Sequence, residues 1–260
     1  MNPKQRWRLL RHPPKPPEMN MAVDEAIAIA FSKGRVPPTL RLYRWSFPSV
    51  SIGSFQQWEP GWDDAGETLR FVRRITGGRA LLHDRELTYS VVAGTRDPLF
   101  AGGIKETFYA IAEGFLAGLT RLGVDAEIYA PPRSHRIGRA QSPLCFASTS
   151  WYEITAQGKK LIGSAQRRWV NHFLQHGSFI LEKSAAAGFP LSENQIGLAE
   201  MLSALPSGEE IEQAIARGFE SALPVRLELE SLTTEEEETA ARLVKEKYGT
   251  DAWNRRRETP

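Results

Sequence analysis

A cluster of short extended runs between residues 39 and 93 constrains the fold of this chain more than any other feature. The runs are rich in β-branched and aromatic residues and are separated by Gly and Pro, which is typical of strands. We predict strands at residues 40–45, 49–52, 71–75 and 87–92. Helical segments flank this cluster without the strict strand–helix alternation of a doubly wound parallel sheet, so the sequence predicts an α+β fold.

Apolar residues recur at intervals of three and four in the segments that we predict as helices. These segments cover residues 19–31, 104–122, 211–223 and 233–248. Further strands are expected at 124–129, 151–155, 160–166 and 177–181, and a turn at Gln157 and Gly158 joins the second of these to the third. We expect one domain over residues 1–260, with an N-terminal arm at 1–17 and a C-terminal helix and tail at 233–260.

The charge balance argues against a nucleic-acid-binding or membrane-surface protein. The chain has 33 Lys and Arg against 31 Asp and Glu, a formal net charge of +2, so no strong overall field would attract a polyanion. No stretch approaches the ~18 apolar residues of a spanning helix, and the basic first residues lack the apolar core of a signal peptide. We therefore expect a cytoplasmic protein, and we take it to be a monomer.

Cys145 is the only cysteine, so it cannot form an internal disulfide and is expected to be a free thiol. It follows a basic loop at 130–144 that shows neither helical nor strand periodicity and carries Arg133, Arg136 and Arg139. A nearby cation favours the thiolate, which is the nucleophilic form of cysteine. A buried, inert side chain is the alternative, and it is the commoner fate of a lone cysteine.

A pair of glycines, Gly77 and Gly78, follows a predicted strand and the basic residues Arg73 and Arg74. Paired glycines permit positive φ and let a ligand approach the backbone closely, but the Gly-Lys-Ser/Thr ending of a Walker loop is absent. An ordinary turn is the alternative. His83, in the same segment, is either a base or a structural hydrogen-bonding residue.

Lys160 begins an apolar strand that continues through the small residues Gly163, Ser164 and Ala165. Small side chains leave room beside a strand. A lysine that enters such a strand would be partly buried, where an ammonium group needs a carbonyl oxygen or an anion. The alternative is a solvated lysine in a hairpin. The segment is therefore a second candidate for contact with a ligand.

Several motifs occur together, in an order that is typical of one enzyme superfamily. They are Asn20-Met21-Ala22-Val23-Asp24-Glu25-Ala26, Arg74-Ile75-Thr76-Gly77-Gly78 with His83, Leu87-Thr88-Tyr89-Ser90 and Lys160-Leu161-Ile162-Gly163-Ser164-Ala165-Gln166. In these motifs the chain resembles the biotin/lipoate protein ligase and lipoyl transferase superfamily, over nearly its whole length. Within it, the chain most resembles the cysteine-dependent octanoyl-[acyl-carrier-protein]:protein N-octanoyltransferases. The combination that carries this resemblance is Cys145-Phe146 ahead of Ser150-Trp151-Tyr152-Glu153, followed by Leu174-Gln175-His176-Gly177-Ser178. Thr149 departs from this subgroup, in which proline is expected.

The resemblance implies a ligase-like catalytic domain, with mixed and antiparallel sheets flanked by helices, and an acyl transfer in two steps. Cys145 would take the octanoyl group from octanoyl-acyl carrier protein, and a lysine of a lipoyl-accepting protein would then take it from Cys145. Lys160 would stabilise the oxyanion of both steps. The acyl site would be lined by Arg74, Thr76, Gly77, Gly78, His83, Gly163, Ser164 and Ala165. No metal or cofactor is implied, and no ATP, because transfer from a thioester to an amide runs downhill.

Three alternatives stay open. An ATP-dependent lipoate–protein ligase shares the fold but activates a free acid and needs no nucleophile such as Cys145. An octanoyl amidotransferase would move the group between lipoyl-accepting proteins through a similar acyl-cysteine. A noncatalytic module would merely hold lipoylated domains. Also open are the acceptor, either the glycine-cleavage H protein or a dehydrogenase E2 lipoyl domain, and the base, either Lys160 or His83.

Overall fold

The computed structural model describes residues 4–65, 68–129, 153–186, 189 and 192–258. The α-helices are α1 (Pro17–Ser32), α2 (Trp62–Ala65), α3 (Ile104–Arg121), α4 (Gly208–Ala222), α5 (Thr234–Leu243) and α6 (Asp251–Asn254). Shorter helical turns are η1 (Pro98–Phe100), η3 (Leu198–Glu200) and the π-helical η4 (Val244–Tyr248). The strands are β1 (Gln5–Arg11), β2 (Thr39–Tyr43), β3 (Ser49–Ile52), β4 (Arg70–Arg73), β5 (Leu81–His83), β6 (Glu86–Gly94), β7 (Glu127–Ile128), β8 (Ile154–Ala156), β9 (Lys159–Arg168), β10 (His172–Ile180) and β11 (Val225–Leu229). No helix within these described ranges is long and apolar enough to span a membrane.

The strands form two mixed sheets. The larger sheet has the order β11-β1-β2-β6-β10-β9-β8-β7, and the smaller has the order β4-β3-β5. β1 runs parallel to both of its neighbours, whereas the pairs from β2 through β6, β10, β9 and β8 to β7 are antiparallel. In the smaller sheet β3 is parallel to β4 and antiparallel to β5. Mixed sheets with helices on their faces confirm the predicted α+β class.

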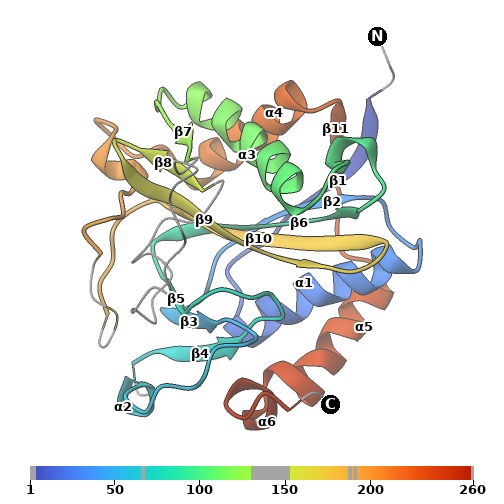
Figure 1. The fold of residues 1–260 in the computed structure, drawn as a ribbon, viewed down its shortest axis with the longest axis vertical. Helices are drawn as coiled ribbons and strands as arrows, with labels where there is room; N and C mark the ends of the chain where they lie inside the picture. The colour runs from blue at the N-terminus through green and yellow to red at the C-terminus, as the bar shows by residue number, and fades with distance from the viewer. Residues whose placement is uncertain (1–3, 66–67, 130–152, 187–188, 190–191, 259–260) are drawn as a thin grey trace.

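The larger sheet separates two helical layers (Figure 1). α3 and α4 cover one face, α1 and α5 cover the other, and the smaller sheet lies beside α1. Successive side chains of a strand point to opposite faces, so Phe173 packs in a core with Phe115 of α3, whereas its neighbour Leu174 packs in a second core with Ile27 of α1. Because both faces are covered, every residue of β2 and β10 is buried.

The face of the sheet toward α1 and α5 also carries charged residues. Arg8 is fully buried and forms a two-pronged ion pair with Glu236, in which Nη1 lies 2.8 Å from Oε2 and Nη2 lies 2.5 Å from Oε1. Glu236 also accepts a hydrogen bond from the N–H of Thr233, which precedes α5. Buried charges are tolerated when they are paired and hydrogen-bonded in this way. The ion pair therefore ties the first turn of α5 to β1.

The N-terminal arm predicted over residues 1–17 is wrong for residues 5–11, which form β1 between β2 and β11. Its charged residues hide the strand, because Arg8 points inward to a partner that comes 228 residues later. The predicted strands also lack β5 and β11, which have only three and five residues. Three residues are too few to show an alternation, whereas β11 does alternate apolar and charged residues over 225–229 and the prediction passed over it.

The C-terminal segment packs against β4. The helix predicted over residues 233–248 divides into α5 and η4, and α6 follows them. Asn254 Oδ1 accepts a hydrogen bond of 2.8 Å from the N–H of Arg73, and Trp253 Nε1 donates one of 2.7 Å to the Arg73 carbonyl. α6 therefore holds the strand that leads into the Gly77–Gly78 segment.

Acid is expected to destabilise the fold in part through His12, which follows β1. Arg41 Nε donates to His12 Nδ1 over 2.8 Å, and burial, together with the charges of Arg41 and Lys15, lowers the pKa of His12 to about 3. In the unfolded chain the ring titrates near its ordinary value of about 6.5. Below that pH the unfolded chain binds a proton that the folded chain excludes, so stability falls as the pH falls. The full linkage at pH 5 is about 2 kcal/mol, and since the ring is partly exposed we expect about 1 kcal/mol.

Urea unfolding at pH 7 and at pH 5 measures this difference in free energy. His12→Gln does not titrate and should lose less stability over the same interval than the wild-type chain. Equal losses in the two proteins would assign the acid sensitivity to other groups.

Candidate active site

The Gly77–Gly78 segment follows β4 in the sequence. It forms a tight turn that lies in space between the end of β3 and β9. Gly78 has a φ of +95°, a conformation that favours glycine. Its carbonyl oxygen lies so close to Gly53, the residue after β3, that a Cβ at Gly53 would come within 1.9 Å of it. A Cβ at Gly78 would lie 3.9 Å from the Cβ of Ala165 on β9. The structure thus brings together the two glycine-rich segments that the sequence singles out.

Arg74 is 4% exposed and holds this turn from the inside. Its Nη2 donates to the carbonyls of Gly77 and Arg79 at 2.9 and 2.8 Å, and its Nη1 donates to the carbonyl of Ser51 at 2.8 Å. The resemblance implied that Arg74 lines the acyl site. Its contacts with these three carbonyls also give the guanidinium a part in shaping the turn.

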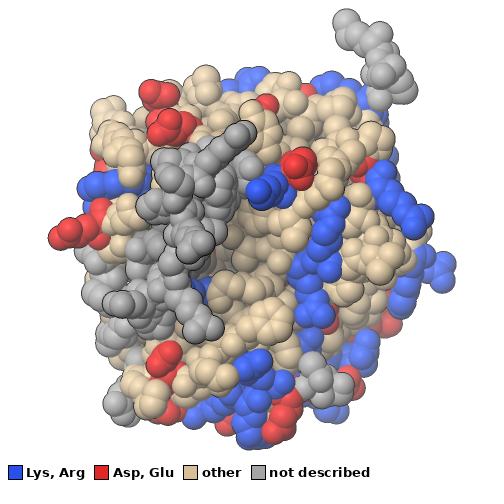
Figure 2. All heavy atoms as spheres, viewed as in Figure 1, with Lys and Arg blue, Asp and Glu red and all other residues tan. Residues whose placement is uncertain are grey.

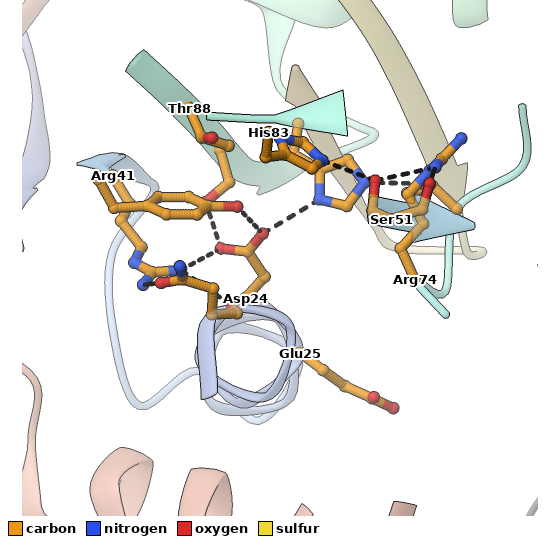
Figure 3. Close-up of polar contacts among 12 residues, drawn as sticks. Asp24, Glu25, Arg41, Ser51, Arg74, His83 and Thr88 are labelled. Carbon is orange, nitrogen blue, oxygen red and sulfur yellow. Dashed lines mark hydrogen bonds and ion pairs between the residues drawn. The ribbon is translucent and has the colours of Figure 1, made fainter. Parts of the chain in front are cut away.

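A chain of buried hydrogen bonds, which we name the α1 chain, connects Thr76 through His176 to Asp24 of α1 (Figure 3). Thr76 Oγ1 lies 2.6 Å from His176 Nε2, and His176 Nδ1 lies 3.0 Å from Asp24 Oδ2. Because a carboxylate only accepts, Nδ1 carries the imidazole proton, and Nε2 accepts from the Thr76 hydroxyl. Asp24 also accepts from Arg41 at 2.7 Å and from the Tyr43 hydroxyl at 2.9 Å.

A second chain, the β6 chain, connects Ser51 of β3 through His83 to Glu86 of β6 (Figure 3). Ser51 Oγ lies 2.7 Å from His83 Nε2, and His83 Nδ1 lies 2.8 Å from Glu86 Oε1. The ring of His83 stacks on Trp45, with the ring centroids 4.0 Å apart. His83 is 3% exposed, and both of its nitrogens contact protein groups, which favours the structural alternative over the base.

Burial and ion pairing set the charges of the α1 chain. Burial alone would raise the pKa of Asp24, but the charge of Arg41 and the hydrogen bonds from His176 and Ser90 outweigh it, so this pKa is lowered. Burial lowers the pKa of His176 although Asp24 opposes the effect. Burial, reinforced by Asp24, raises the pKa of Tyr43 well above its ordinary value. Near pH 7 the carboxylate of Asp24 is therefore charged, while His176 is neutral and Tyr43 keeps its proton.

Lys160 is fully buried at the start of β9. Its Nζ lies 2.5 Å from Oε1 of Glu153, which is 3% exposed. Residues 194–196 cover the strand edge here, since the N–H of Lys160 donates to the Asn194 carbonyl at 2.9 Å and the N–H of Ile196 donates to the Lys160 carbonyl at 3.0 Å. The solvated hairpin lysine, the alternative considered from the sequence, is wrong. The ion pair holds the Lys160 side chain in one orientation inside the protein, where charge interactions are less screened than in water.

Strand alternation separates Ser164 from Ala165. The Ser164 hydroxyl lies 2.6 Å from the Tyr89 hydroxyl, and the Tyr89 ring packs on Phe115 of α3, with centroids 4.4 Å apart. Ala165 lies on the opposite face, toward Gly78. The expected trio of Gly163, Ser164 and Ala165 is therefore divided between the two faces of the sheet.

Cys145 lies outside the described residues, and so do Arg133, Arg136 and Arg139. Figure 2 shows a hollow in the surface of the described part of the molecule. Side chains without charge form its visible floor, and Lys and Arg side chains line one rim. In the same view of the ribbon, the hollow lies at the level of β9 and β10 (Figure 1).

The sequence and the fold of this chain have known counterparts. The sequence matches the lipoyl protein ligase A/B catalytic domain over residues 16–193, which is more than half of the chain. The chain belongs to this family. It is similar to the octanoyltransferase LipM of Kyrpidia tusciae, with 44% identity over 274 residues that cover 97% of this chain and 100% of that protein. It is also similar to the octanoyltransferase LipM of Geobacillus kaustophilus, with 37% identity over 276 residues that cover 98% and 99% of the two chains.

A solved structure of the lipoyl protein ligase family shares the fold. It is a bipartite lipoate protein ligase from Thermoplasma acidophilum, with a TM-score of 0.77 and 25% identity, covering 96% of each chain. The ligase-like architecture expected from the resemblance is therefore confirmed.

His176 and Asp24, which continue the α1 chain from Thr76, were not among the predicted site residues. Both occur in motifs that carry the resemblance to the lipoyl protein ligase family, which was the available signal. Spacing alone could not join them, since 152 residues separate the two bonded side chains. Asp24, Thr76 and His176 all fall within the matched residues 16–193.

Proposed function

We propose that this chain transfers an octanoyl group from octanoyl-acyl carrier protein to a lysine of a lipoyl-accepting protein, through an acyl-Cys145 intermediate. The observation that carries the proposal is the nearly full-length identity of 44% to a protein named octanoyltransferase LipM. The single cysteine of the chain supplies a nucleophile that a ligase would not need.

The reaction has two balanced steps. In the first, the Cys145 thiolate attacks the thioester carbon, the bond to the carrier sulfur breaks, and the carrier thiol leaves with a proton. In the second, the amine of the acceptor lysine attacks acyl-Cys145, an amide forms, and the Cys145 thiol is regenerated with the proton that the amine releases. The first step exchanges one thioester for another and the second runs downhill, so no ATP is consumed.

Lys160 is the proposed source of positive charge for the oxyanion that develops in each step. Its ion pair with Glu153 fixes the side chain before substrate arrives. A preorganised charge needs no rearrangement during the reaction, which is why such groups stabilise transition states strongly. The buried position of Lys160 supports this role better than a solvated position would.

The turn at Gly77 and Gly78, with Ala165 opposite, is the proposed wall of the acyl site. Neither glycine has a side chain, and Ala165 has a short one, so an alkyl chain can approach the backbone closely. Each buried methylene contributes about 0.8 kcal/mol. Such increments select an eight-carbon chain approximately and would admit a decanoyl group at a lower rate.

Transfer is tested by mixing the purified chain with octanoyl-acyl carrier protein and one acceptor at a time, without ATP. We expect the acceptor, either an H protein or an E2 lipoyl domain, to gain the mass of one octanoyl group on a lysine. Product from free octanoate that requires ATP would identify a ligase instead. Product only from an octanoylated lipoyl-accepting protein would identify an amidotransferase.

A further inference from the structure

Both buried chains end on the same guanidinium. Arg74 Nε lies 3.2 Å from Thr76 Oγ1, the end of the α1 chain, and Arg74 Nη1 lies 3.0 Å from Ser51 Oγ, the end of the β6 chain. Each chain has the same order of groups, a guanidinium, a hydroxyl, an imidazole and a carboxylate. Arg74 is therefore the common end of two hydrogen-bond chains that come from different parts of the sequence and contain the same types of groups.

With each imidazole neutral, the groups in each chain fix the direction of every hydrogen bond. A guanidinium only donates and a carboxylate only accepts. The hydroxyls of Thr76 and Ser51 therefore accept from Arg74 and donate to Nε2 of their imidazoles, and each imidazole donates from Nδ1 to its carboxylate. Hydrogen bonds that run in one direction polarise one another, and a buried network that is fully formed holds its members rigidly.

This arrangement also determines how the glycine turn is oriented. Arg74 holds the carbonyl of Gly77, and in a trans peptide the next N–H points the opposite way. The N–H of Gly78 is therefore turned away from Arg74, and no residue in the described part of the chain accepts a hydrogen bond from it. Gly78 itself is exposed. An aimed backbone N–H of this kind suits a carbonyl oxygen that gains negative charge.

We propose that the α1 and β6 chains position Arg74, and through it the N–H of Gly78, for the acyl-transfer reaction. His176 and His83 are then positioning residues that accept hydrogen bonds at Nε2 and do not touch the substrate. The inference rests on the proposed function, because it assigns these residues to acyl transfer. Neither histidine is the base in this scheme.

The test removes one hydroxyl at a time. Thr76→Val keeps the shape of the side chain but breaks the α1 chain, and we expect kcat to fall about 20-fold, with KM for octanoyl-acyl carrier protein within about threefold. Thr76→Ser restores the hydroxyl and should recover most of the rate. Ser51→Ala breaks the β6 chain and should act similarly. Because both chains act through Arg74, the double variant should lose less than the product of the two single losses.

Thr39→Val is the matched control. The Thr39 hydroxyl also accepts from a buried arginine, Arg8, at 3.2 Å, and it donates to the Pro37 carbonyl at 3.0 Å, but it does not contact Arg74. Its loss should lower stability about as much as the loss at Thr76 while leaving kcat unchanged. If Thr76→Val also keeps the wild-type kcat, the α1 chain of hydrogen bonds has only a structural role and the inference is wrong.

Nuclear magnetic resonance gives a readout that does not depend on activity. Both histidines should show the tautomer protonated at Nδ1, and Thr76→Val should shift the amide resonance of Gly78, whereas Thr39→Val should not. A proton on Nε2 of His176, or an unmoved Gly78 amide, would overturn the inference. A wild-type chain that transfers no octanoyl group would instead refute the proposed function, and the spectra would still decide whether Thr76 orients the turn.

Discussion

Cys145→Ala is expected to lower the rate of octanoyl transfer by about 10⁴-fold or more, which is the usual scale when a covalent nucleophile is removed. The alanine variant has no atom that can carry the acyl group between donor and acceptor. Incubation with octanoyl-acyl carrier protein alone should add one octanoyl group to the wild-type chain, as measured by intact mass, and none to the variant. Peptide mapping should place the added group on Cys145.

Cys145→Ser is the control for this experiment. Its hydroxyl is a far weaker nucleophile near neutral pH than a thiol, so any adduct should form slowly and as an ester that resists thiol exchange. Thermal unfolding checks that both variants fold. Wild-type rates in the alanine variant would mean that the acceptor amine attacks the carrier thioester directly.

Lys160→Met is expected to lower kcat by about 10²–10³-fold, the range found when a group that stabilises an oxyanion is removed. Methionine keeps most of the length of the side chain but not its charge. Both half-reactions form a tetrahedral oxyanion, so both should slow in single-turnover measurements. A loss confined to acceptor transfer would instead suggest that Lys160 acts on the acceptor amine.

The Lys160 experiment needs a correction for stability, because Lys160 and Glu153 form a buried ion pair. Breaking a buried pair from one side typically costs about 3–5 kcal/mol. Lys160→Met/Glu153→Gln removes both charges and should recover stability without recovering kcat. If the folded double variant transfers octanoyl at the wild-type rate, Lys160 has no part in the chemistry.

Local pattern was enough to predict the elements whose own residues show a clear helical or strand pattern. The strand expected at 49–52 is β3, and the helix expected at 104–122 is α3 with one residue fewer. The turn at Gln157 and Gly158 is also confirmed, since both residues have positive φ. β1 was missed because its inward-facing Arg8 reads as a surface residue until Glu236 is in place.

The site was predictable as a set of segments but not as a network. The sequence marked Gly77–Gly78 and the small residues of β9 separately, and the structure places Gly78 against Ala165. The hydrogen bond between Thr76 and His176 could not be predicted from local pattern, because the two residues are 100 positions apart in the sequence. The strand predicted at 160–166 already implies that Ser164 and Ala165 face opposite ways, but not that Ser164 is the one that faces Tyr89.

The position of β1 has a consequence for how this chain is made. β2 follows β1 closely in the sequence and can pair with one of its edges soon after both have left the ribosome. The other edge of β1 stays unpaired until β11 has been made about 220 residues later, since Gln5 pairs with Val225. The charge of Arg8 likewise stays unpaired until Glu236 has been made. Contacts between such distant segments form slowly. The nascent chain therefore carries an open edge on β1 until residues 225–236 have been made, and only then can this side of the sheet close.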